Sequence, residues 1–386
     1  MQPVSSIEID LRYEYDTGGF FEQPGSKEAM RVCADFFENI LTDSLSEINA
    51  AATGKVQNSW EARPKHPATG NTLILANLIV PADTLIIYLG GRDLSGGTAG
   101  LATSGFSVGG FTDFVDQVQS RGQAGVLTSP ATDFGPWGGS ITFDTMLDGG
   151  PRIWNFSITE TEPGATNFVG VALHELCHLL GIGVSDSWKD LAPSGGIFSG
   201  EASRIANGGV EPRVTGDKGH WIGSSPGPYV LPAYGSFGTE HGYSQRVLMN
   251  ATSRAGQPEI EVLTDLDIAG LIDVGWEVAV PAQGMTTEEF SNGDRLITIP
   301  TTSNFTYRVQ RGNLVTPFSN LSDLIVGDGT LKTFVDENPP AMKGFYRFTI
   351  SRQAAAGARA VRQARDPNQF RTFSDSWESV GCCQHE

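Results

Sequence analysis

Apolar residues in the first part of the chain recur with the spacings of interleaved strands and helices. Alternation, or short apolar runs between turn residues, predicts strands at residues 7–13, 72–80, 84–89, 139–144 and 154–157. From Ser26 to Ile48 the apolar positions recur every three or four residues, which predicts one long helix capped by Ser26. Residues 111–121 fit either a short helix or a loop.

A second helix is predicted over residues 166–180. Thr166 or Asn167 can cap its start, and Gly181 stands where helices commonly end in a left-handed residue. With the strands around it, this pattern indicates an α+β fold: a mixed, twisted sheet with two long helices on one face.

Beyond residue 183 the periodic pattern is lost. Residues 184–262 are rich in Gly, Ser and Pro, and so long an irregular stretch in a compact domain is usually functional. A helix is predicted at 263–273, capped by Thr264 or Asp265. Alternation then predicts a small all-β, sandwich-like module with strands at residues 296–299, 305–310, 331–335 and 345–350.

These patterns divide the chain into four parts. We expect an N-terminal unit at 1–183, an irregular second unit at 184–281, the β module at 282–350 and a tail at 351–386. The tail is rich in Ala and Arg and then polar, so we expect a solvated or frayed terminus rather than a binding arm.

Composition narrows the class of protein. The chain has 386 residues and a formal net charge of −18, which disfavours nucleic-acid binding because that needs a cationic surface. We expect no transmembrane helix, since no apolar run is long enough, and no signal peptide at the given N-terminus. The oligomeric state stays open.

The four cysteines do not form a disulfide scaffold. Cys33 and Cys177 fall in predicted helices and are expected to be buried free thiols, with a disulfide between them as the alternative. Cys382 and Cys383 lie in the polar tail, where their redox state is open.

The candidate chemistry lies in the second helix, at His174-Glu175-x-x-His178. Residues i and i+4 share a helix face, so both imidazoles can hold one Zn²⁺ ion. Glu175 flanks the pair, where it can accept a proton from a metal-bound water. The alternative is a purely structural role, with two hydrogen-bonded histidines on a core helix.

A catalytic zinc usually takes a third protein ligand. The pattern H-E-x-x-H-x-x-G-x-x-H would place it at Val184, which cannot bind metal. Further along, Gly219-His220-Trp221 is followed by Arg246-Val247-Leu248-Met249. With these residues the segment 7–281 resembles the metzincin zinc peptidases, in particular leishmanolysin-like and bacterial secreted metallopeptidases with an insertion before the third histidine.

This resemblance implies a metzincin-like catalytic domain and a zinc endopeptidase that cleaves protein or peptide substrates by Glu-assisted attack of a zinc-bound water. It implies His174, His178 and His220 as ligands and Glu175 as general base. Met249 would form a hydrophobic floor, unless it is simply a core methionine. It also implies a secreted or cell-surface location.

Further roles follow from the resemblance, and some alternatives stay open. Gly181 would permit the turn after the helix, and the strand at 139–144 would be the edge strand that pairs with an extended substrate. His241 and Glu201 are rival third ligands. His66 and His385 have no supporting context.

A non-catalytic function is the second hypothesis. The chain could be a surface- or matrix-binding protein with a structural zinc, and with the C-terminal module, which resembles small fibronectin-type β units, carrying the interaction. The number of protein ligands discriminates between the two, because a structural zinc takes four and a catalytic zinc three plus water.

Overall fold

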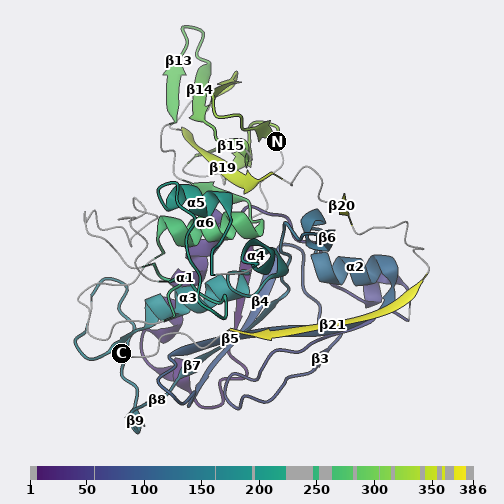
Figure 1. Ribbon diagram of the computed structural model, residues 1–386, viewed down its shortest axis with the longest axis vertical. Coiled ribbons are helices and arrows are strands. Elements are labelled where there is room, and N and C mark those ends of the chain that lie inside the picture. The colour runs from purple at the N-terminus through teal and green to yellow at the C-terminus, as the bar shows by residue number, and fades with distance from the viewer. Residues whose placement is uncertain are drawn as a thin grey trace.

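The architecture below comes from a computed structural model. It describes residues 7–55, 57–160, 162–193, 196–222, 247–251, 263–280, 285–303, 305–313, 318–339, 344–353, 359–360 and 369–379. In Figure 1 a large curled sheet lies at one end of the long axis, helices lie in the middle, and the small β module lies at the other end. The fold is thus mixed α+β, as expected.

The large sheet has seven strands in the order β1-β4-β7-β5-β2-β3, with β21 paired to β5. Three strands run parallel, and β5 is antiparallel to its neighbours. The strands are β1 (Glu8–Arg12), β2 (Ser59–Ala62), β3 (Leu75–Ala76), β4 (Thr84–Arg92), β5 (Gly100–Phe111), β7 (Gly138–Asp144) and β21 (Phe370–Glu378). The strands predicted at 7–13, 84–89 and 139–144 are confirmed.

Strand β4 separates two apolar cores because its successive side chains point to opposite faces. Leu85, Ile87 and Leu89 belong to the larger core, beneath the long helices, whereas Ile86 and Tyr88 belong to a smaller one. This burial on both faces is the reason for the continuous apolar run in the sequence.

Two helices cover the face of the larger core, α1 (Ser26–Ile40) and α3 (Phe168–Leu179). The prediction that the first helix continues to Ile48 is wrong. Leu41 is extended and bridges Val278, and Ile48 bridges Val80. The apolar residues beyond Ile40 are buried in extended chain, so their periodicity did not distinguish the two conformations.

The opposite face of the sheet carries α2 (Thr112–Ser120), which resolves the ambiguous segment 111–121 as a helix. The strand predicted at 72–80 is reduced to β3. Asn77 adopts a positive φ of 50°, and Ile74 and Ile79 are exposed rather than buried. The apolar pattern that predicted a longer strand thus includes residues that are exposed and do not pack into a core.

The second unit contributes three helices, α4 (Asp186–Leu191), α5 (Glu201–Ala206) and α6 (Asp265–Val274). Of the two candidate caps of α6, Thr264 is used: its side chain and that of Asp267 form a reciprocal capping box. The predicted linker at 281–284 lies outside the described residues.

The β module contains the four predicted strands in two sheets. Its strands are β12 (Val278–Val280), β13 (Thr286–Glu289), β14 (Arg295–Pro300), β15 (Phe305–Asn313), β16 (Ser319–Asn320), β17 (Ile325–Val326), β18 (Leu331–Asp336) and β19 (Gly344–Arg352). Strand β12 directly follows α6 and pairs with β19, so the module is joined to the second unit by backbone hydrogen bonds.

Short elements complete the described chain. They are η1 (Phe20–Glu22), η2 (Ala51–Thr53), η3 (Ala124–Leu127), β6 (Thr128–Ser129), β8 (Met146–Leu147), β9 (Gly150–Pro151), β10 (Trp154–Asn155), β11 (Thr166–Asn167) and β20 (Arg359–Ala360). The strand predicted at 154–157 is reduced to β10.

Two expectations about sheet edges are corrected. The strand predicted to pair with substrate, 139–144, is β7, which lies inside the sheet between β4 and β5. The predicted frayed tail is wrong for Phe370–Glu378, which forms β21 and pairs with β5. Backbone pairing rather than an apolar pattern places this strand, so its residues do not predict it.

Cys33 and Cys177 are buried free thiols, so the alternative of a disulfide between them is wrong. Burial raises the pKa of both thiols, which keeps them protonated. Cys382 and Cys383 lie outside the described residues. Of the helices in the described ranges, none combines the length and apolar character that a bilayer span needs.

A buried arginine ties the turns at one end of the sheet together. The guanidinium of Arg121 is fully buried, and burial lowers its pKa to about 10. It donates hydrogen bonds of 2.7–3.0 Å to the backbone carbonyls of Ser46, Pro81, Thr84 and Pro136. The bonds to Thr84 and Pro136 are buried, and a buried carbonyl left without a donor is costly.

We therefore expect Arg121→Met to lower the free energy of unfolding by about 3–5 kcal/mol, because it leaves two buried and two part-buried carbonyls without their donor. Urea denaturation measures the change. Arg63→Met, which removes an exposed pair with Glu61, is the control and should cost under about 0.5 kcal/mol. Equal losses in the two variants would show that Arg121 has no special role.

Candidate metal centre

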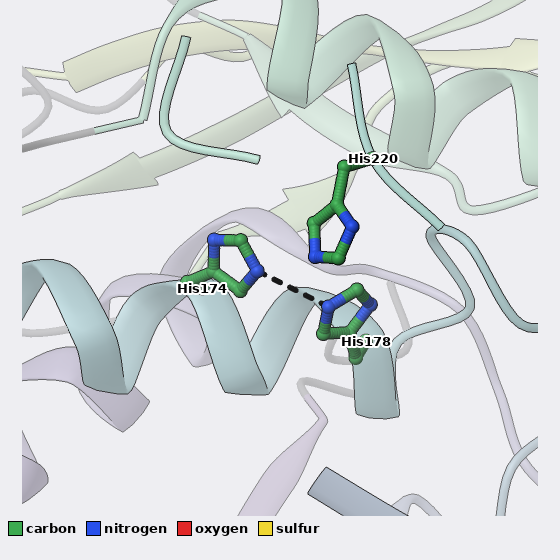
Figure 2. Close-up of side chains that lie close together, drawn as sticks. All are labelled: His174, His178 and His220. Atoms are coloured by element: carbon green, nitrogen blue, oxygen red, sulfur yellow. Dashed lines mark hydrogen bonds between the residues drawn. The ribbon is translucent and has the colours of Figure 1, made fainter. Parts of the chain in front are cut away.

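Helix α3 carries two of the three histidines of the site and is buried on all sides. Asn167 is its N-cap, accepting a hydrogen bond from the Gly170 N–H at 2.6 Å. All residues from Phe168 to Leu179 are buried, so packing rather than intrinsic propensity holds the helix. His174 and His178 project from the same face, one turn apart (Figure 2).

His220 reaches this face from a turn far along the chain. Gly183 has a φ of +80°, and a Cβ there would lie 2.2 Å from the Gly219 carbonyl oxygen. Glycine thus lets the returning chain pass the end of the helix. The Thr215 N–H donates to the His220 carbonyl at 2.9 Å, and the Trp221 N–H donates to the Met249 carbonyl at 2.8 Å. These bonds fix the backbone on both sides of the imidazole.

The three imidazoles converge, as Figure 2 shows. The ring centroids of His174, His178 and His220 lie 4.8, 5.1 and 5.0 Å apart in pairs. One nitrogen of each ring lies within 4.8 Å of those of the others, and all three side chains are fully buried. A buried cluster of this kind can hold a metal ion.

Hydrogen bonds fix the tautomers of the two helix histidines. Nδ1 of His174 lies 2.9 Å from the Leu248 carbonyl oxygen, and Nδ1 of His178 lies 2.8 Å from that of Ile182. A carbonyl only accepts, so each Nδ1 carries the proton and each Nε2 presents a lone pair. The Nε2 atoms are 3.1 Å apart and cannot bond to each other, so a cation between them would relieve the repulsion.

The spacing fits a shared metal ion. Two nitrogens bound tetrahedrally to one zinc at the usual bond length are about 3.3 Å apart. Neither ring nitrogen of His220 has a hydrogen-bond partner, although both are buried, and such unsatisfied groups are costly. A metal ion would satisfy one of them.

The surroundings of the three imidazoles favour their neutral form. Burial lowers the pKa of His174 well below its ordinary value, that of His178 to about 3 and that of His220 to about 4. The neighbouring imidazoles add to the effect at His174 and His178. All three rings are therefore neutral near pH 7, the form that binds metal.

Glu175 follows His174 in α3 and is fully buried, with one carboxylate oxygen unpartnered. Its Oε2 accepts a hydrogen bond from Ser379 Oγ at 3.2 Å, whereas its buried Oε1 has no partner. Burial raises the pKa of Glu175 to about 8, opposed by hydrogen bonds from Ser379 and the Ala102 N–H. A buried carboxyl with this pKa can accept and return a proton near neutral pH.

The turn at Met249 supports the cluster through its backbone. The carboxylate of Asp267 accepts from the Leu248 N–H at 3.0 Å and the Met249 N–H at 3.1 Å. The Leu248 carbonyl in turn orients His174. Met249 itself is fully buried, and its role as a floor under a metal stays a prediction.

The other sequence candidates lie elsewhere. Val184 is buried and not part of the cluster, and Gly181 makes the predicted turn with a φ of +108°. Glu201 forms an ion pair with Arg204 at 2.8 Å, and Nδ1 of His66 accepts from a nearby backbone N–H. His241 and His385 lie outside the described residues.

Sequence reasoning missed Ser379 and Asp267. Ser379 lay in a segment expected to be solvated, and nothing in its sequence context links it to Glu175. Asp267 could have been noticed as the acidic residue three positions after a capping threonine. Its bonds to the Met249 turn, however, depend on tertiary contact.

The comparisons with known proteins add no relatives: no family model matches the chain, and neither does any curated protein or solved structure. The site therefore rests on its own geometry.

We expect His220→Ala to lose most of the metal that the wild-type chain retains, because two imidazoles remain where three converge. Zinc is the test ion, and its content after dialysis against a weak chelator is the measurement. His66→Ala, which alters a histidine outside the cluster, is the control. Loss of zinc in His241→Ala but not in His220→Ala would overturn this choice of third ligand.

Asp267→Asn should weaken zinc binding about 10- to 100-fold, because an amide cannot accept both backbone N–H groups of the turn that orients His174. Competition with a chromophoric chelator measures the affinity. Asp265→Asn, in the same turn of α6, is the matched control and should bind like wild type. Unchanged affinity in Asp267→Asn would show that the turn is held by other contacts.

Proposed function

We propose that this chain is a zinc-dependent endopeptidase of metzincin type. The observation that carries the proposal is the cluster of three buried imidazoles, with Glu175 next to His174 in the sequence of α3 and its Oε1 unpartnered. His174, His178 and His220 would hold the ion, and Glu175 would be the general base.

The surroundings of the site support the same reading. The chain leaves α3 at Gly181, returns a third histidine from outside the helix, and places a methionine turn against the first histidine. Each of these features is expected from the resemblance to metzincins with an insertion before the third histidine. The antiparallel strand β5, next to α3, is the counterpart of an edge strand that could pair with substrate.

The chemistry divides between the ion and Glu175. A bound zinc supplies a Lewis acid that polarises the scissile carbonyl and acidifies water. Glu175 would take the proton of the attacking water on its unpartnered Oε1 and pass it to the leaving amine. Its raised pKa suits both steps, since the carboxylate form accepts and the acid form donates.

A structural zinc is the rival function, with the chain as a surface- or matrix-binding protein. Such a site takes four protein ligands. Within the described residues the cluster contains His174, His178 and His220 and no fourth His, Cys, Asp or Glu. This observation favours a catalytic site. The substrate is then a protein or peptide, and a secreted or cell-surface location stays an expectation.

Glu175→Ala should lower the rate of casein cleavage by about 10²- to 10⁴-fold, the usual contribution of a general base, while zinc stays bound. Initial rates on labelled casein and zinc content are the two measurements. Glu201→Ala, which removes a half-exposed glutamate paired with Arg204, is the matched control and should cleave like wild type. Undiminished cleavage by Glu175→Ala would remove Glu175 from the mechanism.

A further inference from the structure

The outer edge of β5 is occupied by the chain's own C-terminal strand. Strand β21 runs antiparallel to β5, from Phe370 opposite Phe111 to Glu378 opposite Thr103. Figure 1 shows it lying along β5. The opposite edge of β5 is taken by β7 and β2. Both edges of the strand nearest the candidate site are therefore filled.

This covered edge leads directly to the proposed base. The Ser379 N–H donates to the Ala102 carbonyl at 2.8 Å, and the Ala102 N–H donates to Ser379 Oγ at 3.0 Å. The same hydroxyl donates to Glu175. At Gly100 a Cβ would lie 2.8 Å from Glu175 Cγ, so backbone and carboxylate are in close contact there. The C-terminal segment therefore pairs with β5 along its length and ends in a hydrogen bond to the Glu175 carboxylate.

The strand is held mainly by backbone pairing. Seven of its nine residues are exposed, whereas β7 on the other side of β5 is wholly buried. Its side-chain contacts include Phe373 with Phe106, Ser374 Oγ with Ser107 Oγ at 3.0 Å, and ion pairs of Arg371 with Asp116 and Glu378 with Lys65. Trp377, which is half-buried, packs against the larger core. No residue of β21 is buried, so its release would expose the surface under Trp377 but remove no fully buried side chain from either core.

We propose that residues 370–379 are an intramolecular inhibitor, which binds the edge of β5 in place of an extended peptide substrate and covers Glu175. An extended peptide adds to a sheet edge by the same backbone hydrogen bonds, so substrate and β21 compete for it. The proposal rests on the proposed function. Release or proteolytic removal of the C-terminal segment would activate the site.

The first test weakens β21 at one backbone position. Ser379 and Ala102 form a hydrogen-bonded pair, so the alternation of an antiparallel ladder directs the Asp375 N–H to β5 as well. Asp375→Pro removes that N–H, and we expect casein cleavage to rise about tenfold or more as the open fraction grows. Asp375→Ala keeps the N–H and should behave like wild type.

Hydrogen exchange provides a readout that does not depend on activity. In Asp375→Pro the amides of Ala102, Ser104 and Phe106, which face β21, should exchange faster than in Asp375→Ala. A synthetic peptide of residues 370–380, added to Asp375→Pro, should restore both protection and inhibition.

The second test locks the strand. Ser107 and Ser374 are a non-hydrogen-bonded pair with adjoining side chains, so Ser107→Cys with Ser374→Cys can form a disulfide across the ladder. The oxidised protein should be inactive and the reduced one should regain activity, with wild type under the same oxidant as control. Equal cleavage by the two forms would overturn the proposal.

The outcomes separate this proposal from the proposed function. If Asp375→Pro exposes β5 to exchange but cleaves at the wild-type rate, the site is a peptidase and β21 is an ordinary strand. If zinc is bound and β5 is exposed yet no variant cleaves casein, the peptidase function fails and the inhibitor with it. Faster cleavage together with faster exchange supports both.

Discussion

The histidine cluster depends on two hydrogen bonds, which orient the unprotonated ring nitrogens of His174 and His178. His174 and His178 each direct Nδ1 to a backbone carbonyl, and each therefore turns an unprotonated Nε2 inward. Burial keeps these rings neutral, so the two lone pairs face each other 3.1 Å apart with no proton to share. A cation bound between them would remove this repulsion, and the unpartnered ring of His220 could supply a third nitrogen.

The carbonyls that orient these rings come from different parts of the chain. The Ile182 carbonyl belongs to the turn that follows α3. The Leu248 carbonyl belongs to a turn whose Leu248 and Met249 N–H groups donate to Asp267, at the start of α6. The Asp267 carboxylate thus serves two purposes, since it caps the start of α6 and fixes the turn that orients His174. The histidine cluster and the packing of the second unit are therefore joined by one hydrogen-bond network.

Strand β5 is both a central strand of the large sheet and a neighbour of α3, the helix that carries two of the histidines. Strand β5 pairs with buried β7 on one side and with exposed β21 on the other. The first pairing is backed by side chains in both cores, and the second mostly by the backbone. Strand β21 buries fewer side chains than β7 and is therefore held less strongly to β5. Because Ser379, directly after β21, donates to Glu175, release of β21 would change the surroundings of that carboxylate.

The sequence by itself determined the local features. It located both long helices and several strands, among them β1, β4, β7 and four strands of the β module, and it drew attention to His174, Glu175 and His178 through a helical spacing of four residues. It did not predict β5 (Gly100–Phe111). His220 was suggested by a resemblance, and only the tertiary structure brings its ring to the other two. The end of α1 at Ile40, the interior place of β7 and the strand at Phe370–Glu378 were decided by tertiary structure. Each depends on which distant backbone is available to pair, and no local pattern records that choice.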